Sequence, residues 1–322
     1  MKREDIISML GASWDDFGLL VRDALHSDIA LLDSVNDSLL ANSGKQLRPL
    51  LLLLVSKALG SINDDSLHFA ASVELLHNAT LLHDDVADGS SLRRGQATVA
   101  ALMGPSAAVL VGDYWLSKAM DMVMSSKHRN DAVMLFSTVL SNLAQGEMLQ
   151  IEKAAAADTS EEDYMRIIYC KTASLFEAAC VAGALAVDAP QAAMDAAARY
   201  GRAVGLAFQI RDDMFDYTGG DGLGKPVGLD LKEKKITLPL LGALKNSGTE
   251  AEIRAMVRDI EDHPENCTEI QRFVIQGGGL DYASARLDEY ILEARAALDV
   301  FPASEAKDIL AELAGYNAIR KK

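Results

Sequence analysis

Apolar residues recur at three- and four-residue spacing in almost every segment between turn signals, and this spacing limits the chain to helical folds. Phe69, Val73 and Leu76 are typical, whereas runs in which apolar and β-branched residues alternate are rare. Alanine is frequent, which favours helix and lets helices pack closely. We therefore predict an all-α fold, a single-domain bundle of about ten or more helices that covers residues 1–322.

Glycine and proline place the breaks between these helices. They are expected near residues 44, 60, 89–95, 104–105, 188–190, 219–228, 246–248 and 277–279. One helix is expected to start at Asp64 or Ser66, and another at Thr159, where Glu162 would complete a capping box. The connecting loops are short, and none resembles a domain linker.

Charge and apolar run length exclude several classes of protein. Acidic residues outnumber basic ones by 47 to 31, a net charge of -16, so we expect no nucleic-acid partner. The leucine-rich run 49–55 is far shorter than the roughly 20 residues of a membrane span, so no stable membrane anchor is predicted. Cys170, Cys180 and Cys267 lack metal-ligand spacing and the N-terminus lacks a secretory signal. Both features predict a cytoplasmic protein with reduced thiols.

One short pattern occurs twice. Residues 84–88 and 212–216 both read D-D-x-x-D, each at the end of an apolar helical run. Within each motif the first and last aspartates are four residues apart, on one helical face, where like charges destabilise the helix. A single motif is equally well read as a solvated acidic helix end, but two motifs in apolar context favour a function. Because Mg²⁺ binds carboxylates together with phosphate oxygens, the motifs predict metal-assisted binding of a polyphosphate.

Basic residues follow both motifs and also open the leucine-rich helix. Arginine and lysine are the usual partners of phosphate. Each basic cluster alone would more often be a solvated surface, but together they predict an anion pocket in an acidic protein. The clusters are Lys45 and Arg48, then Arg93 and Arg94, then Lys225, Lys232, Lys234 and Lys235.

With these elements in this order, the chain resembles the trans-polyprenyl diphosphate synthases, the polyprenyl synthetase family. The resemblance runs from about residue 44 to the C-terminus. It rests on a GKxxRP element at 44–49, the first aspartate motif with its Arg-Arg-Gly tail at 84–95, Gly146-Glu147, Lys171-Thr172, Gln209 before the second motif, and the lysine-rich loop 224–239. It implies helices arranged around a central catalytic cavity.

The resemblance also implies an activity and a cofactor. The activity is a prenyltransferase reaction that joins isopentenyl diphosphate head-to-tail to an allylic diphosphate and yields an all-trans polyprenyl diphosphate. It implies about three Mg²⁺ ions, replaceable by Mn²⁺. The metal ligands would be Asp84, Asp88 and Asp212. The wider catalytic set would add Asp85, Asp213, Asp216, Lys171 and Lys225.

The resemblance assigns the two substrates to different residues. The allylic diphosphate would contact Arg93, Lys171, Thr172, Gln209, Lys225 and Lys235. Isopentenyl diphosphate would bind without metal on Lys45, Arg48, His77 and Arg94. Taken alone, His77 reads better as a buried core histidine, and only the surrounding motif favours a phosphate partner. The resemblance further implies a homodimer.

The resemblance also implies that product length depends on residues about one turn before the first motif. Ala79 and Thr80 are small and would leave a tunnel open, with Leu76 deeper in it. We therefore predict a long-chain product of about thirty carbons or more, such as a quinone side-chain precursor. A floor formed by Leu76, Trp115 or Met120 would instead give a short-chain farnesyl or geranylgeranyl diphosphate synthase.

Four other functions remain as alternatives. A P-loop is disfavoured because Pro226 follows Lys225 where Ser or Thr should bind Mg²⁺. A metal-dependent phosphohydrolase built on His77, His83 and Asp84 would leave the second motif without a role. A terpene cyclase would not need the elements that bind a second diphosphate. A non-catalytic helical scaffold predicts no ligand that depends on Mg²⁺.

Overall fold

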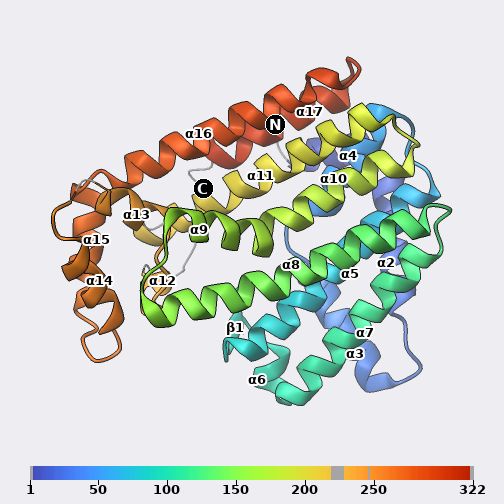
Figure 1. The fold of residues 1–322 in the computed structure, drawn as a ribbon. Coiled ribbons are helices and arrows are strands. Elements are labelled where there is room, and N and C mark those ends of the chain that lie inside the picture. The colour runs from blue at the N-terminus through green and yellow to red at the C-terminus, as the bar shows by residue number, and fades with distance from the viewer. Residues whose placement is uncertain (1–2, 219–227, 246, 320–322) are drawn as a thin grey trace. The chain divides into compact units, whose positions relative to one another are not determined.

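The structure is a computed structural model, and it describes residues 3–218, 228–245 and 247–319. Over these residues the regular structure is helical apart from one two-stranded hairpin (Figure 1). The all-α prediction is therefore confirmed. Lys225, most of the expected break at 219–228 and residue 246 lie outside the described residues.

The chain divides into two compact units, each assembled from separate stretches of sequence. Unit 1 comprises Met1–Phe136, Ala179–Asp195 and Phe301–Leu310, and unit 2 comprises Ser137–Ala178, Ala196–Val300 and Ala311–Lys322. Four helices contribute residues to both units: α8 (Arg129–Ala156), α10 (Ser174–Ala186), α11 (Gln191–Thr218) and α17 (Glu305–Ile319). That the whole chain is one domain stays a prediction.

Unit 1 begins with a run of helices and contains the hairpin. Its elements are α1 (Arg3–Leu10), α2 (Ala12–Leu25), α3 (Ala30–Ala41), α4 (Leu47–Leu59), α5 (Asp64–Ala87), β1 (Leu92–Arg93), β2 (Gln96–Ala97), α6 (Val99–Met103) and α7 (Pro105–Met124). The strands β1 and β2 are antiparallel. Helices α5 and α7 lie side by side (Figure 1).

Helix α4 is buried in unit 1 and is apolar on every side. Residues 49–56 are all buried, which a helix that is hydrophobic all round requires. At Gly183 an added Cβ would lie 2.5 Å from Leu52 O, and Ser56 Oγ donates to Gly183 O at 2.8 Å. Only glycine permits this close approach between backbones.

Helix α5, which carries the first aspartate motif, starts where the sequence predicts. Asn63 is its N-cap residue, and Ser66 N donates to Asn63 Oδ1 at 3.0 Å. Ser66 Oγ in turn accepts from Asn63 N, which completes a capping box. This arrangement fixes the start of a helix 24 residues long.

Unit 2 contains the shorter helices of the C-terminal half. Its elements are α9 (Glu161–Ile168), the π-helical turn η1 (Tyr169–Ala173), α12 (Leu229–Lys232), α13 (Leu238–Leu244), α14 (Glu250–Arg258), α15 (Asn266–Gln276), α16 (Gly279–Ala297) and the 3₁₀ turn η2 (Leu298–Val300). Every residue of α13 is buried. Its close packing against α16 depends on Gly242, where an added Cβ would meet Tyr282 at 2.7 Å.

The predicted capping box of α9 is displaced by one residue. The N-cap is Ser160, not Thr159, and its Oγ accepts from Asp163 N at 3.1 Å. Asp163 accepts from Ser160 N at 3.0 Å and also pairs with Lys153 at 3.2 Å. This second contact favours Asp163 over Glu162 as the capping carboxylate.

One helical stretch differs from the expectation about membrane spans. Residues Glu161–Ala186 are long and apolar enough to cross a membrane by length and composition, and 78% of the most apolar window is buried inside the protein. Its side chains therefore pack as a core helix does.

Candidate active site

The first aspartate motif lies in unit 1, at the carboxyl end of α5. Asp84 and Asp85 belong to its last turn, and Asp88 follows as the C-cap residue. No basic residue lies in this turn, although the helix dipole already places negative charge there. Asp88 is exposed and Asp84 is half-buried, so both carboxylates are accessible to a cation.

Asp85 differs from the other two aspartates because its side chain is buried. Its Oδ1 accepts a hydrogen bond from Arg93 Nε at 2.7 Å. A charge-assisted bond of this length holds the guanidinium firmly. In this structure Asp85 therefore supports Arg93 beside the motif, and its place in the catalytic set stays a prediction.

The hairpin of β1 and β2 brings Arg94 to the GKxxRP element within unit 1. Arg94 and Gly95 form its turn with φ of +52° and +77°, a conformation that is unfavourable for a residue with a side chain. The Arg94 guanidinium lies directly against Gly44, where an added Cβ would displace it from this position. Arg94 Nη1 also donates to Asn42 O at 3.1 Å. The two segments therefore meet, as the predicted anion site requires.

His77 lies two helical turns before Asp84 and close to three arginines. Burial, together with the positive charges of Arg48, Arg94 and Arg93, holds the pKa of His77 well below its usual range. The imidazole is therefore neutral at pH 7 and keeps one N–H donor. Unit 1 thus places cations and a neutral donor around one site, and their role in binding diphosphate stays a prediction.

The residues expected to set product length are enclosed in unit 1. Ala79 and Leu76 are fully buried. Thr80 is half-buried, and its hydroxyl donates to His77 O at 2.8 Å. Lys45, the other predicted ligand of isopentenyl diphosphate, is exposed at the start of its element.

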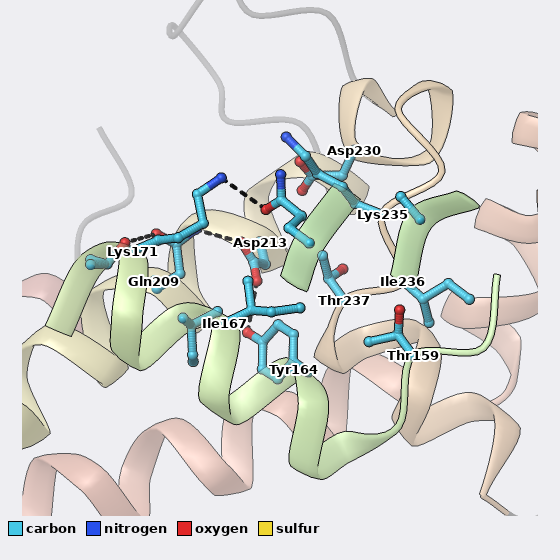
Figure 2. A pocket seen from close by; sticks show the side chains of 14 residues that line it. Thr159, Tyr164, Ile167, Lys171, Gln209, Asp213, Asp230, Lys235, Ile236 and Thr237 are labelled. Atoms are coloured by element: carbon cyan, nitrogen blue, oxygen red, sulfur yellow. Dashed lines mark hydrogen bonds between the residues drawn. The ribbon is translucent and has the colours of Figure 1, made fainter. Parts of the chain in front are cut away.

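Unit 2 contains a pocket of about 210 Å³, and Figure 2 shows the side chains that line it. Five predicted site residues lie on its wall: Lys171, Thr172, Gln209, Asp213 and Lys235. Sequence reasoning assigned no role to four polar residues beside them: Gln150, Tyr164, Asp230 and Thr237. Asp230 belongs to the lysine-rich loop 224–239, so the sequence motif could have pointed to it. Tyr164 lies in no motif.

Asp213 is the buried centre of a hydrogen-bonded chain in this pocket. Its Oδ2 accepts from Tyr164 Oη at 2.7 Å, and its Oδ1 accepts from Gln209 Nε2 at 2.7 Å. Gln209 Oε1 accepts from Thr172 Oγ1 at 2.7 Å. Burial, together with the negative charge of Asp230, raises the pKa of Asp213 well above its usual range. The chain fixes the orientation of the Gln209 amide and the Thr172 hydroxyl.

The other two aspartates of the second motif have different surroundings. Asp212 is exposed, as a metal ligand shared with substrate would be. Asp216 accepts backbone hydrogen bonds from Leu229 N and Asp230 N, each at 3.1 Å. Asp216 therefore caps α12 and anchors the end of the lysine-rich loop.

The π-helical turn η1 presents Lys171 and Thr172 to the pocket. Such turns are frequent at functional sites. Lys171 Nζ forms an ion pair with Glu147 and lies 3.0 Å from Gln150 Oε1. At Gly146 an added Cβ would lie 2.7 Å from Cys170 Cβ. The Gly146-Glu147 pair thus has a local explanation: glycine admits the turn and glutamate holds the ammonium. Lys235 similarly pairs with Glu233.

The accessible aspartates fit magnesium. Among residues 3–218, 228–245 and 247–319, no three His, Cys, Asp or Glu side chains are grouped so that they could hold a metal ion. Protein-bound Mg²⁺ commonly uses one or two carboxylates and completes its shell with substrate phosphates and water. That Asp84, Asp88 and Asp212 are ligands of Mg²⁺ stays a prediction. His83 Nε2 lies 3.3 Å from Asp113 Oδ1.

Comparison with known proteins decides the family. Residues 29–274 match the family model described as polyprenyl synthetase. The chain belongs to the polyprenyl synthetase family. It is 38% identical over 294 residues to an octaprenyl diphosphate synthase of Haemophilus influenzae, which covers 90% of this chain and 88% of that protein.

Two solved structures of the family have the same fold. A decaprenyl diphosphate synthase from Rhodobacter capsulatus superposes with a TM-score of 0.92 and 32% identity over 100% of both chains. A polyprenyl synthase from Caulobacter crescentus, complexed with calcium and isoprenyl diphosphate, superposes with a TM-score of 0.90 and 35% identity. The match covers 100% of this chain and 98% of that one. The resemblance seen in the sequence is thereby confirmed: this polyprenyl synthetase is a trans-prenyltransferase, and the names of its relatives support a long-chain product.

Proposed function

We propose that this polyprenyl synthetase extends an allylic diphosphate with isopentenyl diphosphate to an all-trans product of about thirty carbons or more, a quinone side-chain precursor. One observation carries the proposal. Unit 1 places arginines around a neutral His77 next to a cluster of accessible aspartates. It therefore offers two chemistries for binding diphosphate, one by fixed cations alone and one by carboxylates with metal, as two different substrates require.

The chain's own residues bind and orient both substrates. Arg48, Arg94 and the neutral His77, with Lys45, would donate to the diphosphate of isopentenyl diphosphate. Arginine suits this task because its planar fork matches phosphate oxygens. The other diphosphate would be contacted by Arg93, Lys171, Gln209, Lys225 and Lys235, of which Lys225 lies outside the described residues.

Ionisation of the allylic substrate breaks its C–O bond, and the electron pair leaves with the diphosphate. About three bound Mg²⁺ ions, or Mn²⁺ in their place, would stabilise the charge that develops on this leaving group. The double bond of isopentenyl diphosphate then forms the new C–C bond. No side chain described above is a committed base, so the released diphosphate would take the proton. Lys171 donates to that diphosphate once it leaves Glu147.

Product length would be set along α5. Ala79 and Thr80, with Leu76 deeper, are the residues proposed to border the growing chain. The similarity to an octaprenyl and a decaprenyl diphosphate synthase supports an open tunnel. A short-chain farnesyl or geranylgeranyl diphosphate synthase is the second candidate, because Leu76 is buried one turn below Ala79 and could form a floor.

One experiment tests reaction and product together. Purified protein is incubated with Mg²⁺, isopentenyl diphosphate and each of the dimethylallyl, geranyl, farnesyl and geranylgeranyl diphosphates, and the dephosphorylated products are sized by chromatography. We expect one long-chain product, no turnover after Asp84→Asn or Asp212→Asn, and a shorter product from Ala79→Phe. A farnesyl or geranylgeranyl product from the wild type would refute the long-chain proposal and leave the reaction intact. Unimpaired turnover of both asparagine variants would refute the proposed metal sites.

We further propose a cytoplasmic homodimer. All three cysteines are free thiols, in agreement with a reducing compartment. Large apolar side chains are exposed on α6, α7 and α8, among them Leu102, Leu110 and Met134, and a second copy could cover them. Gel filtration coupled to light scattering would give twice the monomer mass if the dimer forms.

A further inference from the structure

Glu74 is a buried acid in unit 1 to which the function proposed above gives no role. It lies on α5, one turn before His77, and its side chain is only 4% exposed. A buried carboxylate is costly unless other groups compensate for its lost hydration. The groups that surround it therefore indicate what it does.

The neighbours of Glu74 come from three separate segments. Asn78 Nδ2 donates to Glu74 Oε1 at 3.0 Å on the same helix. The Gln46 side chain, from the GKxxRP element, forms a second hydrogen bond with it. Burial raises the pKa of the Glu74 carboxyl, and the positive charges of Arg48 and Arg94 act to lower it. Glu74 thus lies where α4, α5 and the hairpin turn meet.

The backbone shows that these segments are held in place. Gln46 and Arg94 both have a left-handed backbone, with φ of +50° and +52°. Such strain costs on the order of 1 kcal/mol or more per residue and persists only where surrounding contacts over-determine it. Gln46 is the residue that turns the chain into α4, one position after Lys45 and two before Arg48. Arg94 lies flat against Gly44.

Arg48 and Arg94 would repel each other without a compensating charge. They come from distant parts of the sequence, and the neutral His77 beside them adds no negative charge. The negative charge of Glu74 interacts with both guanidinium groups and so offsets part of that repulsion. Because each guanidinium has five N–H donors and no acceptor, donors remain available for a phosphate after the contacts with protein are made.

We propose that Glu74 is a positioning residue for isopentenyl diphosphate, which holds the Arg48 and Arg94 guanidinium groups together in the arrangement that receives the metal-free diphosphate. This inference rests on the proposed function. The carboxylate itself does not touch the substrate. Its removal raises the KM for isopentenyl diphosphate because the substrate must then bring the two arginines together.

The test is the Glu74→Gln variant, which keeps the shape and removes the charge. We expect its KM for isopentenyl diphosphate to rise roughly tenfold, which corresponds to about 1.4 kcal/mol. The KM for farnesyl diphosphate, measured at saturating isopentenyl diphosphate, should change less than twofold. Glu177→Gln is the matched control, because Glu177 is also a partly buried glutamate with a pKa raised by burial, beside Tyr169 in unit 2. It should leave both KM values unchanged.

A second variant keeps the inference testable if Glu74→Gln does not fold. Gln46→Gly relieves the left-handed strain and removes the hydrogen bond to Glu74, so it should fold and still raise the KM for isopentenyl diphosphate. An unchanged or lower KM for that substrate in either folded variant would overturn the inference, and so would an equal rise for both substrates. Absence of any isopentenyl incorporation by the wild-type enzyme would instead refute the proposed function.

Discussion

Neighbouring aspartates in one motif have opposite environments. Asp212 is exposed, whereas Asp213 is buried and accepts hydrogen bonds on both oxygens. The first motif repeats this contrast, since Asp84 and Asp88 are accessible and Asp85 is buried against Arg93. In each motif the second aspartate therefore supports neighbouring side chains. The first and third aspartates differ in the exposure of their carboxylates to solvent.

Removal of the Tyr164 hydroxyl should disturb the pocket of unit 2. In Tyr164→Phe, Asp213 loses one buried donor, which we expect to cost about 1–3 kcal/mol of stability. The Gln209 amide loses its fixed orientation, so kcat should fall several-fold. The measurements are thermal unfolding and steady-state kinetics. Tyr114→Phe is the control: its hydroxyl donates to His26 O at 3.2 Å in unit 1, so kcat should remain at the wild-type value.

The depressed pKa of His77 gives stability a defined dependence on pH. In the unfolded chain this histidine binds a proton near pH 6.5, whereas in the folded protein burial and three arginines resist protonation. The contribution of the neutral His77 to the free energy of unfolding is therefore fully present above about pH 6.5. It is lost as the pH falls below that value. Between pH 7.5 and 5.5 the wild type should lose on the order of 1 kcal/mol more than His77→Gln does.

Urea unfolding of both proteins at the two pH values measures this difference. Subtraction removes the contribution of the carboxyl groups that both proteins share. Equal losses in the two proteins would show that the native pKa of His77 is not depressed.

At the scale of helices, the sequence predicted starts and stops better than it predicted local variants of helix. The start of α5 and the breaks at Gly60 and Gly104 follow from short-range capping and backbone rules. The cap of α9 is displaced by one residue because Asp163 also pairs with Lys153, a contact outside the helix. The π-helical turn η1 had no signal of its own in the sequence, and its close contact with α8 at Gly146 joins segments more than twenty residues apart.

That approach can be tested by adding one methyl group. In Gly146→Ala the new Cβ would lie 2.9 Å from Lys171 Cγ and closer still to Cys170, so the turn must shift. We expect a loss of about 1–3 kcal/mol from overpacking and a rise in the KM for the allylic substrate. Gly18→Ala, where nothing lies within 4 Å, should be neutral or stabilise the protein by up to about 1 kcal/mol.

At the scale of the whole molecule, sequence reasoning recognised the family because its motifs are spread along the chain in a fixed order. It identified the aspartates of the two motifs and the neighbouring arginines and lysines as candidate site residues. It did not identify Tyr164 or Glu74, because their proposed roles depend on contacts between segments that are distant in the sequence. Tyr164 is 49 residues from Asp213. Glu74 lies on α5, whereas Arg94 lies in the turn of the hairpin that follows this helix.

The proposed role of each aspartate motif in binding diphosphate with Mg²⁺ can be measured as ligand-induced stability. A bisphosphonate with Mg²⁺ should raise the melting temperature of the wild type by several degrees, since a ligand at about 100 times its Kd adds about 2.7 kcal/mol. Chelation of Mg²⁺ should abolish the shift, and so should Asp84→Asn or Asp212→Asn alone. Asp64→Asn, at the opposite end of α5, should retain it. A full shift in either motif variant would mean that one motif suffices.

The dependence of α4 on Gly183 has a consequence for synthesis of the chain. The leucine-rich helix leaves the ribosome more than a hundred residues before the glycine that it packs against, and residues 301–310 of the same unit follow that glycine by more than a hundred residues. Until then the nascent polypeptide exposes an apolar helix. Chaperones bind exposed apolar surface, and such surface aggregates when nothing covers it. Unit 1 therefore cannot complete its core before residues 301–310 have been synthesised.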